Sequence, residues 1–382
     1  MKIGTTCVHA GYEPDDATGA VNVPIYATST YAYRKFGEHR GWEYSRTGNP
    51  TRNALELAMA ELEGGADAIA FASGLAAIDA ITDLLEPGDH MVVADNLYGG
   101  TYRLFTTTTM RHGIEVTFVD SANPAAFAAA CTDRTRMIFV ETPTNPLMHV
   151  VDLAGIGAIA REHGALMVVD NTFLTPVLQR PFDFGADLVV HSTTKYLNGH
   201  SDGVGGVVVT KEAELGERLH TVQNNVGAIL GPFDAYLVLR GLKTLAVRMG
   251  VHEANARSLA GFLLARQEIV RVLYPGLTNH PQHALARKQQ SGFGGMISFD
   301  LGSIEKAAAF CNSVEIFTLA ESLGGVESLV CHPATMTHAS VPAEERQRLG
   351  IGDGMVRLSV GIEDAADLEG DISTALEAAK AV

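Results

Sequence analysis

The stretch Leu188-Val189-Val190-His191-Ser192-Thr193-Thr194-Lys195 joins a short apolar run to a polar turn that ends in a lysine. Similar apolar runs recur between residues 68 and 209, and Gly, Asp or Thr bounds them. Short bounded apolar runs are typical of strands that are buried on both faces of a sheet. The runs predict seven strands, at residues 68–71, 91–94, 116–119, 137–140, 166–169, 188–190 and 204–209.

Helical stretches separate several of these strands. Apolar periodicity predicts helices at residues 53–62, 75–85, 124–131 and 153–163. Alternation of strands and helices indicates an α/β fold with a mostly parallel sheet and helices on both faces. After Gly231-Pro232 the pattern changes, and it predicts a helical stretch at 233–267, strands at 272–274, 296–299, 330 and 356–360, and a last helix at 368–379.

Three regions follow from this pattern. Residues 1–47 show little helical periodicity but contain six tyrosine or tryptophan residues. That aromatic content favours an N-terminal arm that packs onto a neighbouring subunit over a disordered tail. Residues 48–232 are predicted to form the sheet domain that binds the ligand, and residues 233–382 a smaller C-terminal α+β domain.

The composition excludes several classes of partner. Apolar residues make up 46% and charged residues 19% of the chain, as in a compact folded protein. The formal charge of −16 disfavours nucleic acid and anionic membranes as partners. No apolar run approaches the ~18 residues of a membrane helix, and the N-terminus lacks an apolar signal segment. The four cysteines are scattered and the histidines lack metal-ligand spacing, so we expect a cytoplasmic protein with reduced thiols and no metal site.

Polar residues follow four of the predicted strands, where ligands bind in an open α/β sheet. They are Ser73-Gly74-Leu75, Tyr98, Asp170 and the segment Ser192–Lys195. Each has an ordinary explanation by itself, because an aspartate after a strand is often a helix N-cap and most lysines are solvated surface charges. Lys195, however, lies in a stretch with few other charges, which favours a special role.

Together these residues match the chemical parts of one cofactor. Phosphate suits a helix N-terminus flanked by hydroxyl groups, here Gly74, Leu75, Ser192 and Thr194. Asp170 could pair with a protonated ring nitrogen, Tyr98 could stack on an aromatic ring, and Lys195 could attack an aldehyde. These parts make up pyridoxal 5′-phosphate, for which proteins supply a lysine Schiff base and an acidic partner of the ring nitrogen.

Five longer motifs extend this match over nearly the whole chain. They are Tyr44-Ser45-Arg46-Thr47-Gly48-Asn49-Pro50-Thr51-Arg52, Glu141-Thr142-Pro143-Thr144-Asn145-Pro146, Val169-Asp170-Asn171-Thr172-Phe173, Ser192-Thr193-Thr194-Lys195-Tyr196-Leu197-Asn198-Gly199-His200-Ser201-Asp202 and Ala320-Glu321-Ser322-Leu323-Gly324-Gly325-Val326-Glu327-Ser328-Leu329. They resemble the Cys/Met-metabolism branch of fold-type-I pyridoxal phosphate enzymes, which includes cystathionine γ-lyases, γ-synthases and β-lyases and methionine γ-lyases. The resemblance implies the fold-type-I transferase fold and a homotetramer built from two dimers.

The resemblance also implies roles by position. Lys195 would bind the cofactor and move the α-proton of the substrate, Asp170 would keep the ring nitrogen protonated, and Tyr98 would stack on the ring and serve as acid or base. The phosphate would be bound by Gly74, Leu75, Ser192 and Thr194, and from the neighbouring subunit by Tyr44 and Arg46. The substrate carboxylate would be bound by Asn145, Ser322 and Arg357, and the distal end of the substrate by Glu321, Glu43 and Arg103.

Within the family we expect a cystathionine γ-lyase. Methionine γ-lyases typically carry a cysteine where this chain has Gly100, and the carboxylate of Glu321 suits the distal ammonium group of cystathionine. The segments Phe71–Leu75, Tyr274–Leu277 and Met336–Ser340 resemble γ-lyases more than the enterobacterial type of γ-synthase. A γ-synthase that joins an O-acylhomoserine to cysteine is the alternative.

Two other classes fit less well. A dinucleotide-binding protein would need a glycine fingerprint after the first strand and an acidic residue about 20 residues further on, which Ser73–Ala77 does not supply. A non-catalytic relative would have no need to combine Lys195, Asp170, Tyr98 and Arg357.

Overall fold

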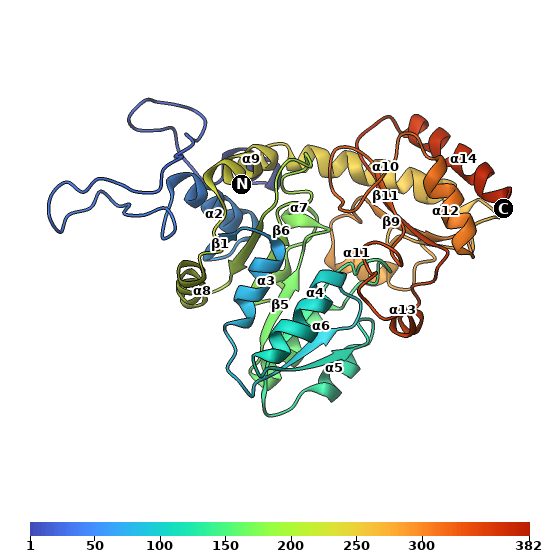
Figure 1. Ribbon diagram of the computed structural model, residues 1–382, viewed down its shortest axis with the longest axis horizontal. Helices are drawn as coiled ribbons and strands as arrows, with labels where there is room; N and C mark the ends of the chain where they lie inside the picture. The colour runs from blue at the N-terminus through green and yellow to red at the C-terminus, as the bar shows by residue number, and fades with distance from the viewer.

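The computed structural model describes residues 1–382 and contains two β-sheets (Figure 1). The larger sheet has seven strands in the order β1-β7-β6-β5-β4-β2-β3. Its strands are β1 (Asp67–Phe71), β2 (His90–Ala94), β3 (Glu115–Val119), β4 (Thr135–Glu141), β5 (Leu166–Asp170), β6 (Leu188–Ser192) and β7 (Gly206–Thr210). All seven strands predicted from the apolar runs are confirmed, and the α/β class with them.

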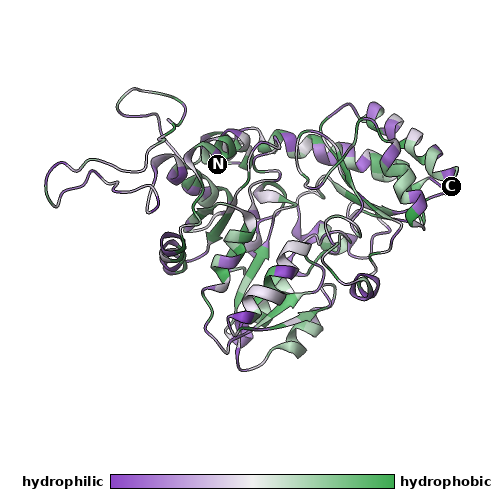
Figure 2. Cartoon of the chain, viewed as in Figure 1, coloured by the Kyte–Doolittle hydropathy of each residue, from purple (hydrophilic) through white to green (hydrophobic).

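Five neighbouring strands of this sheet, from β6 to β3, run parallel, and only β7 is antiparallel to its two neighbours. Strands β2 and β7 are buried throughout and β5 is buried except at Leu166, and Figure 2 shows the strands of this sheet as the apolar centre of this part of the molecule. Parallel direction brings the carboxyl ends of β4, β5 and β6 to the same edge of the sheet. Residues that follow these strands therefore lie close together, as the sequence predicted.

Four of the helices that surround the larger sheet begin at a residue whose side chain caps them. Asn49 and Ser73 cap α2 and α3 with their side chains, and Asn123 and Asp152 cap α5 and α6 in the same way. The helical elements of this part are α2 (Pro50–Glu63), α3 (Gly74–Thr82), α4 (Gly99–Arg103), η1 (Leu104–Thr109), α5 (Pro124–Ala130), α6 (Leu153–His163), α7 (Thr175–Leu178), η2 (Pro181–Phe184) and α8 (Ala213–Val226).

The smaller sheet has five strands in the order β10-β11-β12-β9-β8. They are β8 (Arg271–Leu273), β9 (Met296–Asp300), β10 (Thr318–Leu319), β11 (Leu329–Cys331) and β12 (Met355–Ser359). The sequence predicted four of them and missed the two-residue strand β10. The remaining helices are α9 (Pro232–Leu242), α10 (Leu245–Leu264), α11 (His283–Gln289), α12 (Ile304–Ser313), α13 (Ala343–Leu349) and α14 (Ala365–Lys380).

The helical stretch predicted at residues 233–267 is confirmed as helical, and it consists of two helices, α9 and α10. The helical conformation is interrupted at Lys243-Thr244. Gly241 packs so closely on Leu197 and Asn198 that a Cβ there would lie 2.3 Å from the Asn198 carbonyl oxygen. Arg248 donates to the Gly241 carbonyl at 2.8 Å, which takes the place of a further helical hydrogen bond.

The two sheets have separate hydrophobic cores that meet along α10. The larger core includes Leu245 and Met249, and the smaller core begins with Ala256 on the same helix. The region boundaries at residues 47/48 and 232/233 stay predictions. No helix is both long and apolar enough to cross a membrane.

The N-terminal region contains one element that the sequence did not predict. Helix α1 (Ile3–His9) contacts α2 and α10 and buries only Thr6 and Cys7. A seven-residue helix with two buried residues leaves too weak a periodicity to detect. The loops between α1 and α2 project from the body of the molecule (Figure 1).

Candidate active site

The amino end of α3 lies beside the end of β6. Ser73 caps the helix by accepting from the Ala76 N–H, while Gly74 and Leu75 are in the first turn, whose N–H groups have no acceptor within the helix. A Cβ on Gly74 would lie 3.0 Å from the Cβ of Ser192. Glycine thus leaves room at a point where two backbone N–H groups and the hydroxyl of Ser192 meet, which is suitable geometry for an anion.

Thr194 lies in the turn after β6. Its hydroxyl donates to the Gly205 carbonyl at 3.3 Å and accepts from the Gly205 N–H at 3.1 Å. These bonds hold the turn against the segment that leads into β7.

Asp170 ends β5 and is buried. Its carboxylate accepts from the Thr172 N–H at 3.0 Å, and the Thr172 hydroxyl accepts from the Ser192 N–H at 2.9 Å. Burial raises the pKa of Asp170, and the hydrogen bonds from Thr172 oppose that shift. A buried carboxylate with an unused oxygen is suited to pair with a cationic N–H group.

Glu141 pairs with Asp170 across β4 and β5, so two carboxyl groups lie side by side. Burial, and then the charge of Asp170, raise the pKa of Glu141 well above its ordinary value. Glu141 is therefore the more readily protonated group of the pair. It also accepts from the Tyr98 N–H at 2.9 Å, which holds the loop before α4 against this edge of the sheet.

Lys195 has lost most of its contact with water. Its Nζ donates to the Ser322 Oγ at 2.7 Å. Burial, followed by the nearby positive charge of Arg357, lowers the pKa of Lys195 to about 8, and the charge of Glu321 opposes this shift. An amine with such a pKa is partly neutral near pH 7, as nucleophilic attack requires.

Arg357 comes from β12 of the smaller sheet and is 2% exposed. Its Nη1 donates to the Asn145 Oδ1 and its Nη2 to the Ser322 carbonyl oxygen, both at 2.9 Å, whereas its buried Nε has no partner. Ser322 has φ of 89°, a conformation that is costly for a residue with a side chain and is common at functional sites. The guanidinium group is thus fixed and keeps donors available for a carboxylate.

Eleven of the fifteen predicted site residues lie at or near the meeting point of the two sheets, and four lie elsewhere. Tyr44, Arg46 and Glu43 are on the projecting N-terminal loops, where Arg46 Nη1 donates to the Asn224 carbonyl at 2.6 Å and Glu43 accepts from the Tyr33 hydroxyl at 2.9 Å. Arg103, at the end of α4, is exposed and forms no side-chain ion pair. No group of three or more His, Cys, Asp or Glu side chains is arranged to hold a metal ion.

His338 is a contact residue that sequence reasoning missed. Its Nε2 lies 3.1 Å from the Leu97 carbonyl and 3.0 Å from the Asn145 carbonyl, and its Nδ1 lies 2.9 Å from the Thr337 hydroxyl. Burial lowers the pKa of His338 to about 4, so the ring is neutral. It joins the loop that carries Tyr98 to the residue that fixes Arg357. The segment Met336–Ser340 was noted for its resemblance to γ-lyases, but nothing in it pointed to this contact.

These features fit pyridoxal phosphate. An open anion site at Gly74, a buried carboxylate at Asp170, a half-exposed aromatic ring at Tyr98 and an amine of lowered pKa at Lys195 correspond to its phosphate, ring nitrogen, ring face and aldehyde. Together with a mostly parallel seven-stranded sheet and a smaller C-terminal sheet, they define the class of fold-type-I pyridoxal phosphate enzymes.

The chain belongs to the family of Cys/Met metabolism PLP-dependent enzymes, whose family model matches residues 4–377. It is 54% identical to the cystathionine γ-lyase of Bacillus subtilis, over 99% of this chain and 100% of that protein. It is 52% identical to a cystathionine β-lyase of Lactococcus lactis, over 98% and 99% of the two chains. A solved structure of the cystathionine γ-synthase of Xanthomonas oryzae is 48% identical and superimposes with a TM-score of 0.98, covering 100% of this chain and 99% of that one.

The family membership confirms the prediction of a pyridoxal-phosphate-dependent enzyme. The three relatives carry three different activities at similar identity, so the family alone leaves the reaction open.

Proposed function

We propose that this enzyme is a cystathionine γ-lyase, which converts L-cystathionine and one water molecule to cysteine, 2-oxobutanoate and ammonia. The observation that carries the choice of cystathionine as substrate is the place of Glu321 beside the pair formed by Lys195 and Ser322. Glu321 is exposed, yet its charge acts on the pKa of Lys195, so it lies at the mouth of the site. A carboxylate there would attract the distal ammonium group of cystathionine, which a simple alkyl substrate lacks.

The choice of γ-cleavage rests on further support. The segments Phe71–Leu75, Tyr274–Leu277 and Met336–Ser340 resemble those of γ-lyases, and the B. subtilis γ-lyase is 54% identical to this chain. A γ-synthase remains the second candidate, because Glu321 would suit cystathionine equally well as a product and a γ-synthase structure superimposes at a TM-score of 0.98.

The substrate's α-carboxylate would bind to the fixed guanidinium group of Arg357, with Asn145 and Ser322 holding that group in place. This contact would set the α-carbon next to the Nζ of Lys195, which is already held by the Ser322 hydroxyl. Orientation of this kind lowers the barrier to proton transfer because the reacting atoms meet without further ordering.

Bound pyridoxal phosphate supplies an electron sink that stabilises negative charge on the substrate during bond cleavage. Asp170 would hold the proton on the ring nitrogen, and the neutral Nζ of Lys195 would take the α-proton and pass protons onward. The Tyr98 hydroxyl would give a proton to the departing cysteine sulfur. Tyr98 is 41% exposed, so one face of its ring is free to lie against a ligand.

We also propose that the enzyme is a homotetramer whose N-terminal loops complete the site of a neighbouring subunit. Those loops carry several exposed large apolar side chains, among them Phe36, Tyr33 and Tyr44. Phe36 is fully exposed on a projecting loop, and contact with a neighbouring subunit would remove its side chain from water. A neighbouring subunit would then receive Tyr44 and Arg46 at its phosphate and Glu43 near its substrate.

The experiment is to supply the loaded enzyme with L-cystathionine alone and identify the keto acid. Release of 2-oxobutanoate at an enzyme-like rate supports the γ-lyase proposal, whereas pyruvate would mean β-elimination. If neither keto acid forms, and O-succinylhomoserine with cysteine gives cystathionine, the γ-synthase is correct.

A further inference from the structure

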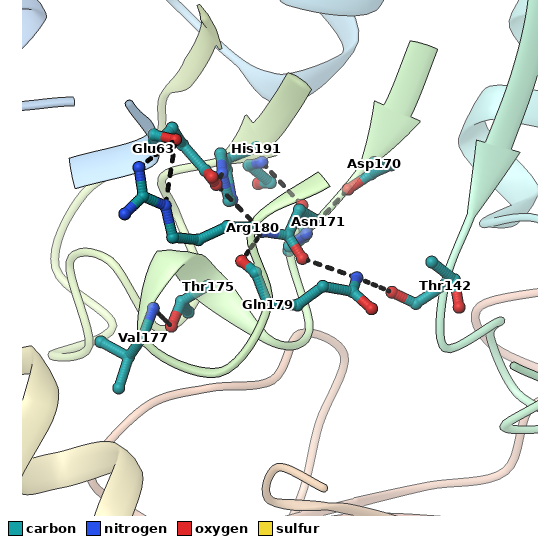
Figure 3. Close-up of polar contacts among 11 residues, drawn as sticks. Glu63, Thr142, Asp170, Asn171, Thr175, Val177, Gln179, Arg180 and His191 are labelled. Atoms are coloured by element: carbon teal, nitrogen blue, oxygen red, sulfur yellow. Dashed lines mark hydrogen bonds and ion pairs between the residues drawn. The ribbon is translucent and has the colours of Figure 1, made fainter. Parts of the chain in front are cut away.

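A network of buried polar side chains joins the carboxyl ends of three neighbouring strands of the larger sheet (Figure 3). Its centre is Glu63, the last residue of α2, which is fully buried together with His191 and Asn171. None of these three residues was given a role from the sequence, and none belongs to the proposed catalytic set.

Glu63 holds the ends of β5 and β6 with one oxygen atom. The Glu63 Oε1 lies 2.6 Å from the His191 Nε2 and accepts from the Asn171 Nδ2 at 2.9 Å. Asn171 directly follows Asp170, and His191 directly precedes the segment Ser192–Lys195. A single carboxylate therefore links the two segments that carry the proposed partners of the ring nitrogen, the phosphate and the aldehyde.

Gln179 extends the network to the end of β4. The Gln179 Nε2 donates to the Asn171 Oδ1 at 3.0 Å and to the Thr142 backbone carbonyl at 3.3 Å. The backbone carbonyl of Gln179 accepts from the Asn171 Nδ2 at 2.9 Å. Thr142 follows Glu141, the last residue of β4. The amide of Asn171 is thus fixed at its nitrogen and its oxygen, which leaves the backbone next to Asp170 little freedom to shift.

The charges of the network act on Asp170, a proposed partner of the cofactor. Glu63 and His191 are 0% exposed, and the electrostatic interaction of Asp170 with His191 acts to lower the pKa of Asp170, against the larger effect of burial. A carboxylate hydrogen-bonded to an imidazole in a dry interior is a strong, charge-assisted contact, and removal of one partner leaves the other without compensation.

We propose that Glu63 is a positioning residue for the cofactor: through Asn171 and His191 it sets the distance between Asp170 and the Ser192–Lys195 segment. This inference rests on the proposed roles of Asp170 and Lys195. Because Asp170 ends β5 and Lys195 follows β6, a shift of one strand end relative to the other changes the spacing that one cofactor molecule would have to span.

The test compares Glu63→Gln with the matched control Glu61→Gln, two residues earlier on the same helix, where the side chain is exposed and forms no hydrogen bond or ion pair. Pyridoxal phosphate is titrated into each apo-protein, and binding is followed by visible absorbance. We expect Glu63→Gln to bind the cofactor about tenfold more weakly, the effect of losing one charge-assisted contact, with an altered visible spectrum. Glu61→Gln should match the wild type in both readouts.

A folded Glu63→Gln protein with wild-type cofactor affinity and spectrum would overturn the inference. If Glu63→Gln does not fold, Asn171→Leu takes its place, because leucine keeps the approximate volume of the side chain but cannot donate to the Glu63 carboxylate; unchanged affinity there would overturn it equally. Borohydride treatment of the loaded wild-type enzyme, followed by peptide mass spectrometry, separates the two proposals. A label on a residue other than Lys195 would refute the proposed site itself, whereas a label on Lys195 leaves only the role of Glu63 under test.

Discussion

Replacement of Arg357 by lysine tests the proposed substrate site most directly. The structure gives the guanidinium group two fixed hydrogen bonds, to Asn145 and to the Ser322 carbonyl, and leaves its buried Nε without a partner. Lysine keeps the positive charge but has no planar fork, so it cannot hold those two acceptors and also bind a carboxylate through two parallel hydrogen bonds.

The expected loss follows from the number of contacts removed. One or two charge-assisted hydrogen bonds to the substrate carboxylate are lost, which amounts to about 2 to 4 kcal/mol. At 1.36 kcal/mol for each factor of ten, kcat/KM for cystathionine should fall about 30-fold to about 1,000-fold. Most of the fall should be in KM, because the carboxylate is bound in the ground state and in the transition state alike.

The assay is steady-state release of keto acid by Arg357→Lys, with cofactor content and melting temperature measured on the same sample. Arg348→Lys is the control, since Arg348 is a surface residue paired with Glu345 and should stay within about twofold of the wild type. A KM within about threefold of the wild type in a folded, cofactor-loaded Arg357→Lys enzyme would refute the proposed carboxylate contact.

Two further predictions concern the cofactor. The apo-enzyme should combine with pyridoxal phosphate faster as the pH rises from about 7 to about 9, with a midpoint near 8. The reason is that only the neutral form of Lys195 attacks an aldehyde, and the pKa of Lys195 is lowered to about 8. A rate that is independent of pH over this range, measured by stopped-flow absorbance, would contradict the assignment. Gly74→Ala should leave the protein folded, at a cost of about 1 to 3 kcal/mol, but weaken cofactor binding about tenfold, because the new methyl group would lie 3.0 Å from Ser192 and fill the phosphate position. Equal affinity of Gly74→Ala and the wild type in an absorbance titration would show that the phosphate binds elsewhere.

The sequence predicted the larger sheet well because most of its strands, though not the edge strand β3, are buried on both faces and therefore form apolar runs with clear ends. It predicted the smaller half less completely. Strand β10 has only two residues, both exposed, so it leaves no apolar signal. The break between α9 and α10 is set by the backbone of a single residue, Thr244, with φ of −111° and ψ of 4°, which the helical pattern of the surrounding residues does not reveal.

The site residues also divide into those that a local sequence pattern predicted and those that depend on contacts between distant parts of the chain. Gly74, Asp170 and Ser192 could be grouped from sequence because each follows a strand of one sheet. The contact of Arg357 with Asn145 and Ser322 joins two sheets and was reached only through family resemblance. Glu63 ends a helix at an unremarkable position, and its role depends on partners 108 and 128 residues away. Long-range polar contacts of this kind have no signature in a single sequence.

The electrostatics of the site tie substrate binding to the reactivity of Lys195. In the substrate-free protein the charge of Arg357 lowers the pKa of Lys195, next to the larger effect of burial. A substrate carboxylate bound to Arg357 would cancel much of that positive charge, and the pKa of Lys195 would then rise. Near pH 7 the neutral, nucleophilic form of the lysine would therefore be most populated before a carboxylate binds. Once a carboxylate is in place, the neutral amine would be a stronger base but a smaller fraction of the lysine would be neutral. One arginine would serve both steps because its two effects occur at different times.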